Sequence, residues 1–180
     1  VYGRLDKLFI KLFQAEKNQM IHILLDMSRS MGFGTPPKHH LAKKIAAAIS
    51  YICLTHMNQV GLTAFTEAVL STKREAGGRQ GYLPLLNYLL TLKPGEQTRI
   101  NASLSHYAAT SSQAGVAVII SDLLDPDGFE RGVKALRFAR FDISIVQLLD
   151  HQELFPALNG HLILEDMESG RTKRLITDRE

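Results

Sequence analysis

Two short segments of the chain carry oxygen-bearing side chains at a spacing that suits a metal ion. The first places Asp26, Ser28 and Ser30 on alternate positions directly after an apolar run. The second places Ser121 and Asp122 after another apolar run. Hard cations such as magnesium bind oxygen ligands and keep several of their waters, so few carboxylates and several hydroxyls suit them. These residues predict a divalent-cation site, provided that the fold brings the two segments together.

The same residue types also allow explanations without metal chemistry. An aspartate after a strand is often the N-cap of the next helix, and Ser28 and Ser30 could bond their own backbone in a loop. Zinc is disfavoured, because His39 and His40 are adjacent rather than four residues apart and are expected to be solvated at a helix start. Three further aspartates are expected to be turn residues rather than ligands: Asp125, Asp127 and Asp150.

Length and composition indicate a folded domain. The 180 residues suffice for one domain over residues 1–180, and 45% hydrophobic with 22% charged residues excludes a disordered chain. The longest nearly apolar stretch, residues 45–54, is about half of the roughly 20 residues that a membrane-spanning helix needs. The first residue is Val1 rather than Met, so we expect a fragment of a longer protein, whose targeting signals lie elsewhere.

Charge and cysteine usage narrow the class of partner and the compartment. The net charge of +3 comes from 21 basic and 18 acidic residues spread along the chain, which does not predict a nucleic-acid partner. The lone Cys53 cannot form an internal disulfide and is expected to be a buried, inert thiol. A reducing compartment, the cytoplasm, is therefore expected, and membrane association of a longer parent protein stays open.

The candidate ligands require strands to position them, and the hydrophobic pattern predicts an alternation of strands and helices. Strands are expected over residues 8–13, 20–25, 60–65, 116–120 and 143–149. Helices are expected over residues 82–92, 102–109 and 129–138, and over an earlier segment where Leu41, Ile45, Ile49 and Ile52 recur at helical spacing with Lys43 and Lys44 facing away. This order predicts an α/β fold: a doubly wound, mainly parallel sheet with helices on both faces.

Two consequences follow for the core and for the C-terminus. The core positions are expected to include Ile23, Leu25, Val118 and Ile120. Asp26 and Asp122 should then lie at solvent-facing strand ends, where ligands of open α/β sheets collect. Near the C-terminus, the turn sequence at residues 168–170 lies between two apolar segments, which predicts an edge β-hairpin.

The first segment also carries a family resemblance. Residues 26–30 resemble the Asp-x-Ser-x-Ser motif of the metal-ion-dependent adhesion site in the von Willebrand factor A fold. Thr98, before a helix, resembles the second loop of that site, and residues 121–122 resemble its third. The resemblance implies one magnesium ion, with manganese or calcium as alternatives. It also implies these metal ligands: Asp26, Ser28, Ser30, Thr98 and Asp122.

A narrower resemblance covers nearly the whole chain. Residues 25–32, 60–65, 120–122 and 164–170 resemble the bacterial family called domain of unknown function fifty-eight, whose members are typically encoded beside MoxR-type AAA+ ATPases. One departure is the second loop, where the family usually has glycine next to the threonine that corresponds to Thr98. That loop is therefore expected to follow a different path.

The leading functional hypothesis is a divalent-cation-dependent protein-binding module. Three hydroxyls and two carboxylates leave the cation at least one exchangeable water, which an Asp or Glu of a partner protein can replace. The family resemblance implies that the partner is a MoxR-type AAA+ ATPase or its client, in assembly or chaperone-like work.

The alternative is a magnesium-dependent phosphatase that uses Asp26 as its nucleophile. Phosphotransferases of the haloacid dehalogenase type carry a second acid two residues later, where this chain has Ser28. A hydroxyl is a poor proton donor at neutral pH, because general acids work best with a pKa near the operating pH. The chain also lacks a Gly-x-Ser-x-Gly elbow and a phosphate-binding Gly-x-x-x-x-Gly-Lys run. We therefore expect no catalytic residues.

Overall fold

The computed structural model describes residues 19–66, 69–75, 77–95, 99–156, 160–165 and 172–177. The strand predicted over residues 8–13 lies outside these ranges. The strands are β1 (Met20–Asp26), β2 (Gln59–Phe65), β3 (Val69–Glu75), β4 (Val116–Ser121), β5 (Asp142–Gln147), β6 (Gly160–Glu165) and β7 (Thr172–Thr177). The α-helices are α1 (Lys38–Thr55), α2 (Tyr82–Thr91), α3 (Ile100–Thr110), α4 (Glu130–Phe138) and α5 (His151–Leu154).

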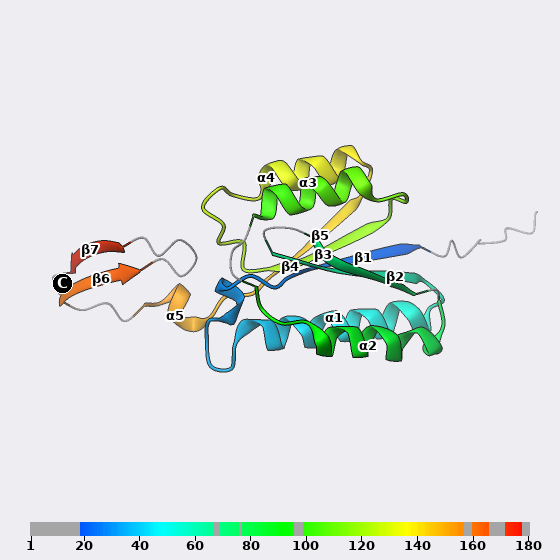
Figure 1. Cartoon of the computed structure of the whole chain (residues 1–180), viewed down its shortest axis with the longest axis horizontal. Helices are drawn as coiled ribbons and strands as arrows, with labels where there is room; N and C mark the ends of the chain where they lie inside the picture. The colour runs from blue at the N-terminus through cyan, green and yellow to red at the C-terminus, as the bar shows by residue number, and fades with distance from the viewer. Residues whose placement is uncertain are drawn as a thin grey trace, which may run out of the picture.

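The main sheet has five strands in the order β3-β2-β1-β4-β5. Neighbouring strands are parallel except for β3, which is antiparallel to β2 and forms one edge. Figure 1 shows α1 and α2 on one face of this sheet and α3 and α4 on the other. The predicted doubly wound, mainly parallel α/β fold is confirmed, whereas β3 was not expected from the sequence.

The central strand β1 is buried along its whole length, and its side chains alternate between the two faces. Ile23 and Leu25 pack in the core beneath α1 and α2, together with Val118 and Ile120 of β4. Leu24 packs in the second core beneath α3 and α4. All four predicted core positions are therefore confirmed. Burial of one such aliphatic side chain stabilises the fold by about 1.5–3 kcal/mol.

The buried face of α1 agrees with the prediction only in part, because Ile45 and Ile49 are half-buried against the core but the other two predicted residues are not. Leu41 and Ile52 are 52% and 57% exposed, whereas Ala42, Ala46 and Leu54 are fully buried. The buried stripe is thus rotated about the helix axis relative to the expected one. Because alanine side chains are short, they let a helix approach its neighbours closely, and they contribute little to a hydrophobic periodicity.

Two further residues of α1, Lys43 and Cys53, were the subject of predictions. Lys43 does not face away from the protein, because its ammonium donates to the Leu92 carbonyl at 2.6 Å, just beyond the last residue of α2. A cation there suits the negative end of the α2 dipole. Cys53 is a half-buried free thiol, and burial raises its pKa, as expected for an unreactive cysteine.

The C-terminal hairpin forms as predicted, with β6 antiparallel to β7 from the pair Gly160 and Thr177 to the pair Glu165 and Thr172. It is a separate two-stranded sheet in the described part of the chain and does not extend the main sheet, whose edge next to β2 is β3. Among the described residues, none of the helices is both long and apolar enough to cross a membrane.

Candidate metal centre

The carboxyl ends of β1 and β4 bring the first and third predicted loops together. The two strands are parallel neighbours with Leu25 opposite Ile120, so the residues that follow them leave the sheet at the same edge. From β1 the chain passes through α1 to β2, which lies on one side of β1 in the sheet, whereas β4 lies on the other side. Such a switch in strand order is where ligands bind in open α/β sheets.

Two methionines fix the loop that follows β1. Met27 and Met31 are fully buried and stand on either side of the loop serines. The backbone of Met27 is also held, because its N–H donates to the Phe65 carbonyl at 2.9 Å and its carbonyl accepts from the Gly95 N–H at 2.6 Å. The loop between them is therefore attached to the core at both ends.

Asp26 is fully buried at the end of β1. Its Oδ1 accepts from the Ser28 N–H at 2.9 Å, and its Oδ2 accepts from the Ser121 hydroxyl at 2.6 Å. Burial nevertheless raises the pKa of Asp26 to about 6, against the lowering effect of these hydrogen bonds and with a small further increase from the Asp122 charge. The protein alone compensates this carboxylate incompletely, and a nearby cation would supply what is missing.

The two loop serines present neighbouring hydroxyl oxygens. Ser28 Oγ lies 3.0 Å from Ser30 Oγ, and Ser28 is buried while Ser30 is half-buried. Magnesium holds oxygen ligands at about 2.1 Å in octahedral geometry, so two adjacent ligands lie about 3 Å apart. The two hydroxyls therefore already have the spacing of neighbouring ligands of such an ion.

Asp122, on the third loop, has a cationic partner. Its Oδ1 accepts from the Leu124 N–H at 3.1 Å, and its Oδ2 lies 2.8 Å from the Lys38 ammonium. The Gln147 side-chain amide donates to the Asp122 carbonyl at 3.1 Å. The expectation that Asp26 and Asp122 face solvent is wrong: their exposed fractions are 0% and 1%, because the flanking loops, Lys38 and the segment of α5 enclose the strand ends.

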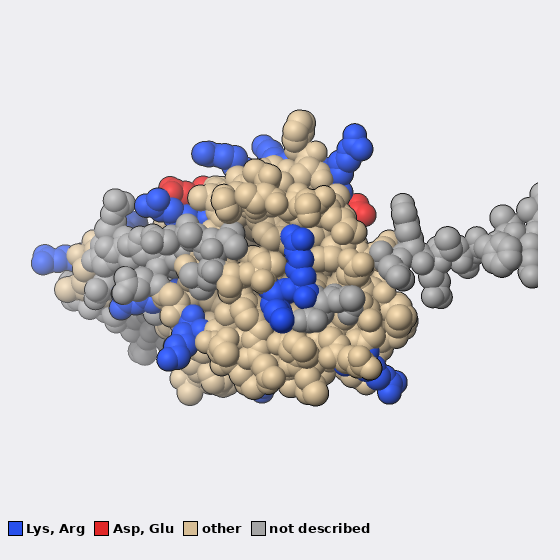
Figure 2. Space-filling view, turned by 45° about the vertical axis from the view of Figure 1, so that its right-hand side comes forward, with Lys and Arg blue, Asp and Glu red and all other residues tan. Residues whose placement is uncertain are grey.

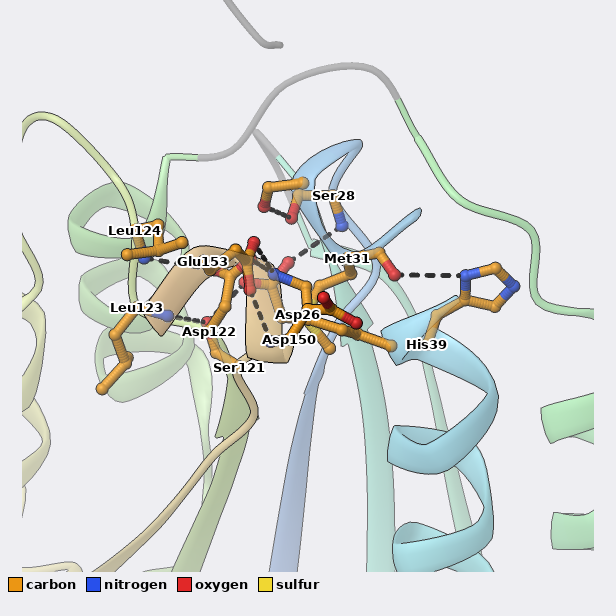
Figure 3. A network of polar contacts seen from close by, with 12 residues as sticks. Asp26, Ser28, Met31, His39, Ser121, Asp122, Leu123, Leu124, Asp150 and Glu153 are labelled. Carbon is orange, nitrogen blue, oxygen red and sulfur yellow. Dashed lines mark hydrogen bonds and ion pairs between the residues drawn. The ribbon is translucent and has the colours of Figure 1, made fainter. Parts of the chain in front are cut away.

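The Lys38 ammonium also contacts α5. It lies 2.5 Å from Glu153 Oε1, while Glu153 Oε2 accepts from the Asp150 N–H at 2.7 Å. Asp150 Oδ1 in turn accepts from the Gln152 N–H at 2.9 Å, which completes a capping box for α5. Figure 3 shows Asp150 and Glu153 beside Asp122 and the loop that carries Ser28. Asp150 is thus the N-cap of α5, where a turn residue was expected.

The second loop is described only at its two ends. Thr98 lies outside the described residues, so its predicted role as a ligand has no structural description. The flanking residues approach the site region, because the Gly95 N–H bonds to Met27 and the Arg99 N–H lies 3.4 Å from the Thr66 carbonyl. The loop therefore starts and ends beside the carboxyl ends of β1 and β2.

Asp125 and Asp127 lie in a turn, and the adjacent histidines His39 and His40 lie near the surface. Asp125 accepts from the Asp127 N–H at 2.8 Å and from the Ile100 N–H at 2.7 Å, where it caps α3. His39 is half-buried and His40 is exposed at the start of α1. Within the described ranges, no group of three or more His, Cys, Asp or Glu side chains is placed to hold a metal. A metal at the strand ends would therefore depend on the serine hydroxyls.

Sequence reasoning missed Lys38 and Glu153. Lys38 is the first residue of α1, where the helix dipole disfavours a cation. The sequence pattern therefore does not predict that this lysine is buried. The spacing of Asp150 and Glu153 does fit a capping box, which could have indicated α5.

On the face in Figure 2, Lys and Arg side chains are spread over several places rather than gathered in one continuous patch.

Sequence comparisons relate the chain to uncharacterised proteins. The family profile described as "Protein of unknown function DUF58" matches residues 1–180. The uncharacterized protein Rv1480 of Mycobacterium tuberculosis is 27% identical over 169 residues, which are 91% of this chain and 53% of that protein. The uncharacterized protein Mb1516 of Mycobacterium bovis gives the same values. The chain thus spans about half the length of the curated relatives it matches.

Solved structures with a similar fold include three bacterial proteins. BatB from Bacteroides thetaiotaomicron has a TM-score of 0.59 at 15% identity, covering 88% of this chain and 80% of that chain. An aerotolerance-related membrane protein from Bacteroides fragilis has a TM-score of 0.57 at 17% identity, covering 88% and 81%. A von Willebrand factor type A protein from Catenulispora acidiphila has a TM-score of 0.53 at 17% identity, covering 71% and 32%. At these identities the likeness shows the fold, which is of the von Willebrand factor A type.

Proposed function

The chain belongs to the family of proteins of unknown function DUF58, and we propose that it is a protein-binding module that acts through a divalent cation at the carboxyl ends of β1 and β4. The observation that carries this proposal is the combination of Asp26, Ser28 and Ser30. Asp26 is a fully buried carboxylate with hydrogen bonds but no ion-pair partner among the described residues, and the two serine hydroxyls lie 3.0 Å apart beside it.

The chemistry of these donors fits magnesium, with manganese or calcium as alternatives. Both oxygens of Asp26 accept one hydrogen bond, and a carboxylate has about four lone-pair sites, so each oxygen can still accept from another group. The two hydroxyls add neutral oxygens, and Asp122 supplies a second carboxylate nearby. Thr98 remains a candidate ligand by its resemblance to the second loop of the adhesion site.

The proposed role of the cation is to receive an acidic side chain from a partner protein. The hydroxyls contribute no charge, so the two carboxylates alone offset the charge of the cation, and the ion keeps exchangeable waters. An Asp or Glu of the partner that replaces one water gains a directional bond to the largest local charge. The family resemblance makes a MoxR-type AAA+ ATPase or its client the first partner to test, in assembly or chaperone-like work.

The phosphatase alternative is weaker than the binding module. A nucleophilic carboxylate must reach the phosphorus of a phosphate ester, but Asp26 is fully buried, which hinders a bulky ester more than a small ion. The position two residues later is Ser28, whose hydroxyl is a poor general acid. We therefore infer that the domain is not an enzyme.

Titration calorimetry with magnesium and manganese tests the metal site. The wild-type chain should bind one ion, and Ser28→Ala should weaken binding, because the variant loses one of the paired hydroxyls. Ser112→Ala is the matched control, since Ser112 is an exposed serine in the loop between α3 and β4. If wild type binds no ion, or if Ser28→Ala binds it like the control, the assignment is wrong.

Partner binding is tested separately, by capture of a MoxR-type AAA+ ATPase on the immobilised chain. Chelator should abolish capture, and magnesium should restore it. Capture that withstands chelator would contradict a metal-bridged mechanism even if the metal site exists. A screen for phosphatase activity serves the alternative: magnesium-dependent turnover that disappears in Asp26→Asn would favour the enzyme.

A further inference from the structure

One buried cation connects three elements at the proposed metal site. The Lys38 ammonium at the start of α1 lies 2.8 Å from Asp122 Oδ2 and 2.5 Å from Glu153 Oε1 of α5. The exposed fractions of the three side chains are 5% for Lys38, 2% for Asp122 and 18% for Glu153. Asp122 is therefore already paired with a cation that belongs to the chain itself.

This ion-pair cluster explains why a lysine is buried at an unfavourable place. The amino end of a helix carries a partial positive charge, which repels the ammonium, and burial removes its water. Two carboxylates offset both effects, one from the β4 loop and one from α5. Without Glu153, Lys38 would keep Asp122 as its one ion-pair partner among the described residues.

The helix α5 depends on the same contact. It has only four residues and none of them is buried, and the apolar side chains of Leu154 and Phe155 are 54% and 68% exposed. A cavity of about 360 Å³ lies between residues 33–35 and the start of α5. Apolar packing by α5 itself therefore contributes little to holding it in place, and the ion pair of Glu153 with Lys38 is the side-chain contact that joins α5 to the site.

We propose that α5 is an intramolecular inhibitor of the metal site, because Glu153 holds Lys38 on the carboxylate that the divalent cation needs. The inference rests on the proposed function, since it concerns the same cation. Each oxygen of Asp122 already has one partner, Oδ1 the Leu124 N–H and Oδ2 the Lys38 ammonium, and only the ammonium adds a positive charge that opposes a second cation. A divalent ion on this carboxylate would repel the ammonium in an enclosed, poorly solvated site.

Cation binding therefore displaces Lys38 from Asp122 and releases α5. Once Lys38 moves, Glu153 keeps only its bond to the Asp150 N–H, and a helix of four residues is not stable on its own. Coupling of this kind is reciprocal. If cation binding weakens the attachment of α5 by a certain factor, detaching α5 strengthens cation binding by the same factor. The metal-free chain is the inhibited, low-affinity state.

The experiment combines magnesium affinity with hydrogen exchange in the full chain. Glu153→Gln removes the charge that holds Lys38, and Glu130→Gln is the control, because it removes the same charge from an exposed position on α4. We expect Glu153→Gln to bind magnesium about fivefold or more tightly than wild type, within the usual range of coupling factors, and Glu130→Gln to bind it like wild type.

Hydrogen exchange reports on α5 directly. The amides of Glu153, Leu154 and Phe155 donate to the carbonyls of Asp150 and His151 at the start of the helix, so their exchange follows the opening of α5. Saturating magnesium should accelerate their exchange in wild type, and in Glu153→Gln the exchange should be fast without magnesium. Glu153→Asp keeps the charge but is too short to reach Lys38 in the same way, so it should behave like Glu153→Gln. If Glu153→Gln does not fold, Glu153→Asp takes its place in the experiment.

Two outcomes overturn the inference, and they differ. Equal magnesium affinity in Glu153→Gln and Glu130→Gln, with α5 amides unaffected by saturating magnesium, would show that the ion binds without disturbing Lys38, which leaves the proposed metal site intact. No magnesium binding in wild type, Glu153→Gln or Glu153→Asp would reject the metal site and the inhibition together.

Discussion

His22 and Asp26 lie on the same face of β1, four residues apart, and both are fully buried. His22, in the middle of the strand, is surrounded by rings: its Nδ1 lies 2.7 Å from the Tyr107 hydroxyl, and Phe141 packs with its ring centroid 4.9 Å away. Its Nε2 is a buried atom without a hydrogen-bond partner in the described part of the chain. Asp26, at the strand end, accepts hydrogen bonds at both oxygens.

The two environments shift the pKa of each group towards its neutral form, but with different results at pH 7. Burial lowers the pKa of His22 to about 4, so the imidazole is neutral. Burial raises the pKa of Asp26 to about 6, so this carboxylate is still charged. In the middle of the strand, the buried polar group is therefore uncharged. At the end of the strand, the buried carboxylate is charged, because loop N–H and O–H groups donate to it there and a cation can bind beside it.

The largest expected effect concerns metal binding. Asp26→Asn removes the buried charge while keeping a similar shape, and we expect magnesium affinity to fall about a thousandfold or more, which corresponds to about 4 kcal/mol. His22→Leu, on the same face of the same strand, should leave the affinity unchanged. Calorimetric titration of both variants tests the contrast, and similar losses in the two would mean that the strand end has no special role in cation binding.

Stability should show the reverse contrast. His22→Ala leaves a cavity among Tyr107, Phe141 and Leu24, and we expect it to lower the free energy of unfolding by about 3–4 kcal/mol, as for other buried ring truncations. Asp26→Asn should cost far less in the metal-free protein, because it removes a charge that burial penalises. Urea denaturation in the presence of chelator measures both. A larger loss in Asp26→Asn would contradict this comparison.

The pH dependence of stability should separate the two groups by sign. The unfolded state protonates His22 near 6.5 and the folded state near 4, so the contribution of His22 to stability falls as the pH is lowered through this window. The folded state protonates Asp26 near 6 and the unfolded state near 3.8, so its contribution rises as the pH falls from about 6. In the metal-free wild type the two trends oppose each other.

Variants that remove one group should expose the trend of the other. From pH 7 to pH 4.5, Asp26→Asn should lose on the order of 2 kcal/mol more stability than wild type, and His22→Leu should lose less or gain. Urea midpoints at several pH values in chelator give the comparison. Parallel pH profiles for wild type and both variants would show that neither group titrates as described.

The smallest effects concern single hydroxyl groups. Tyr107→Phe removes the hydrogen bond to His22 and should lower the free energy of unfolding by about 1 kcal/mol, the usual net contribution of one buried hydrogen bond. Ser121→Ala removes the hydrogen bond to Asp26 and also the one that the hydroxyl accepts from the Leu123 N–H, so we expect a loss of about 1–2 kcal/mol. In Ser121→Ala the pKa of Asp26 should also rise, because that hydroxyl lowers it. Carboxyl chemical shifts followed by NMR against pH would detect the difference.

The fold was predictable because most of its strands and helices bury regular apolar patterns. β1, β2 and β4 lie close to their predicted bounds, since buried strands are continuous or alternating apolar runs. β5 is a largely exposed edge strand, but its apolar residues still predicted it. β3, the other edge strand, was missed because its sequence contains Lys73, Arg74 and Glu75. The face of α1 was predicted only in part because Ala42 and Ala46 carry a weak hydrophobic signal.

The site was predictable to the extent that adjacent strand ends determine it. Asp26, Ser28, Ser30 and Asp122 reach one edge of the sheet, and the Ser121 hydroxyl joins the two loops. Lys38 could not be predicted, because its partners are 84 and 115 residues away in the sequence and no motif relates them. Long-range ion pairs depend on packing that a one-dimensional pattern does not contain.

The methionines on either side of the loop serines affect the entropy of ion capture. Met27 and Met31 are both fully buried, so the residues between them are held in place before any ion arrives. Ordering one residue costs about 1–2 kcal/mol, and here that loss of conformational freedom occurs during folding rather than during binding. A ligand set made largely of neutral oxygens can then bind an ion without also having to order its own loop.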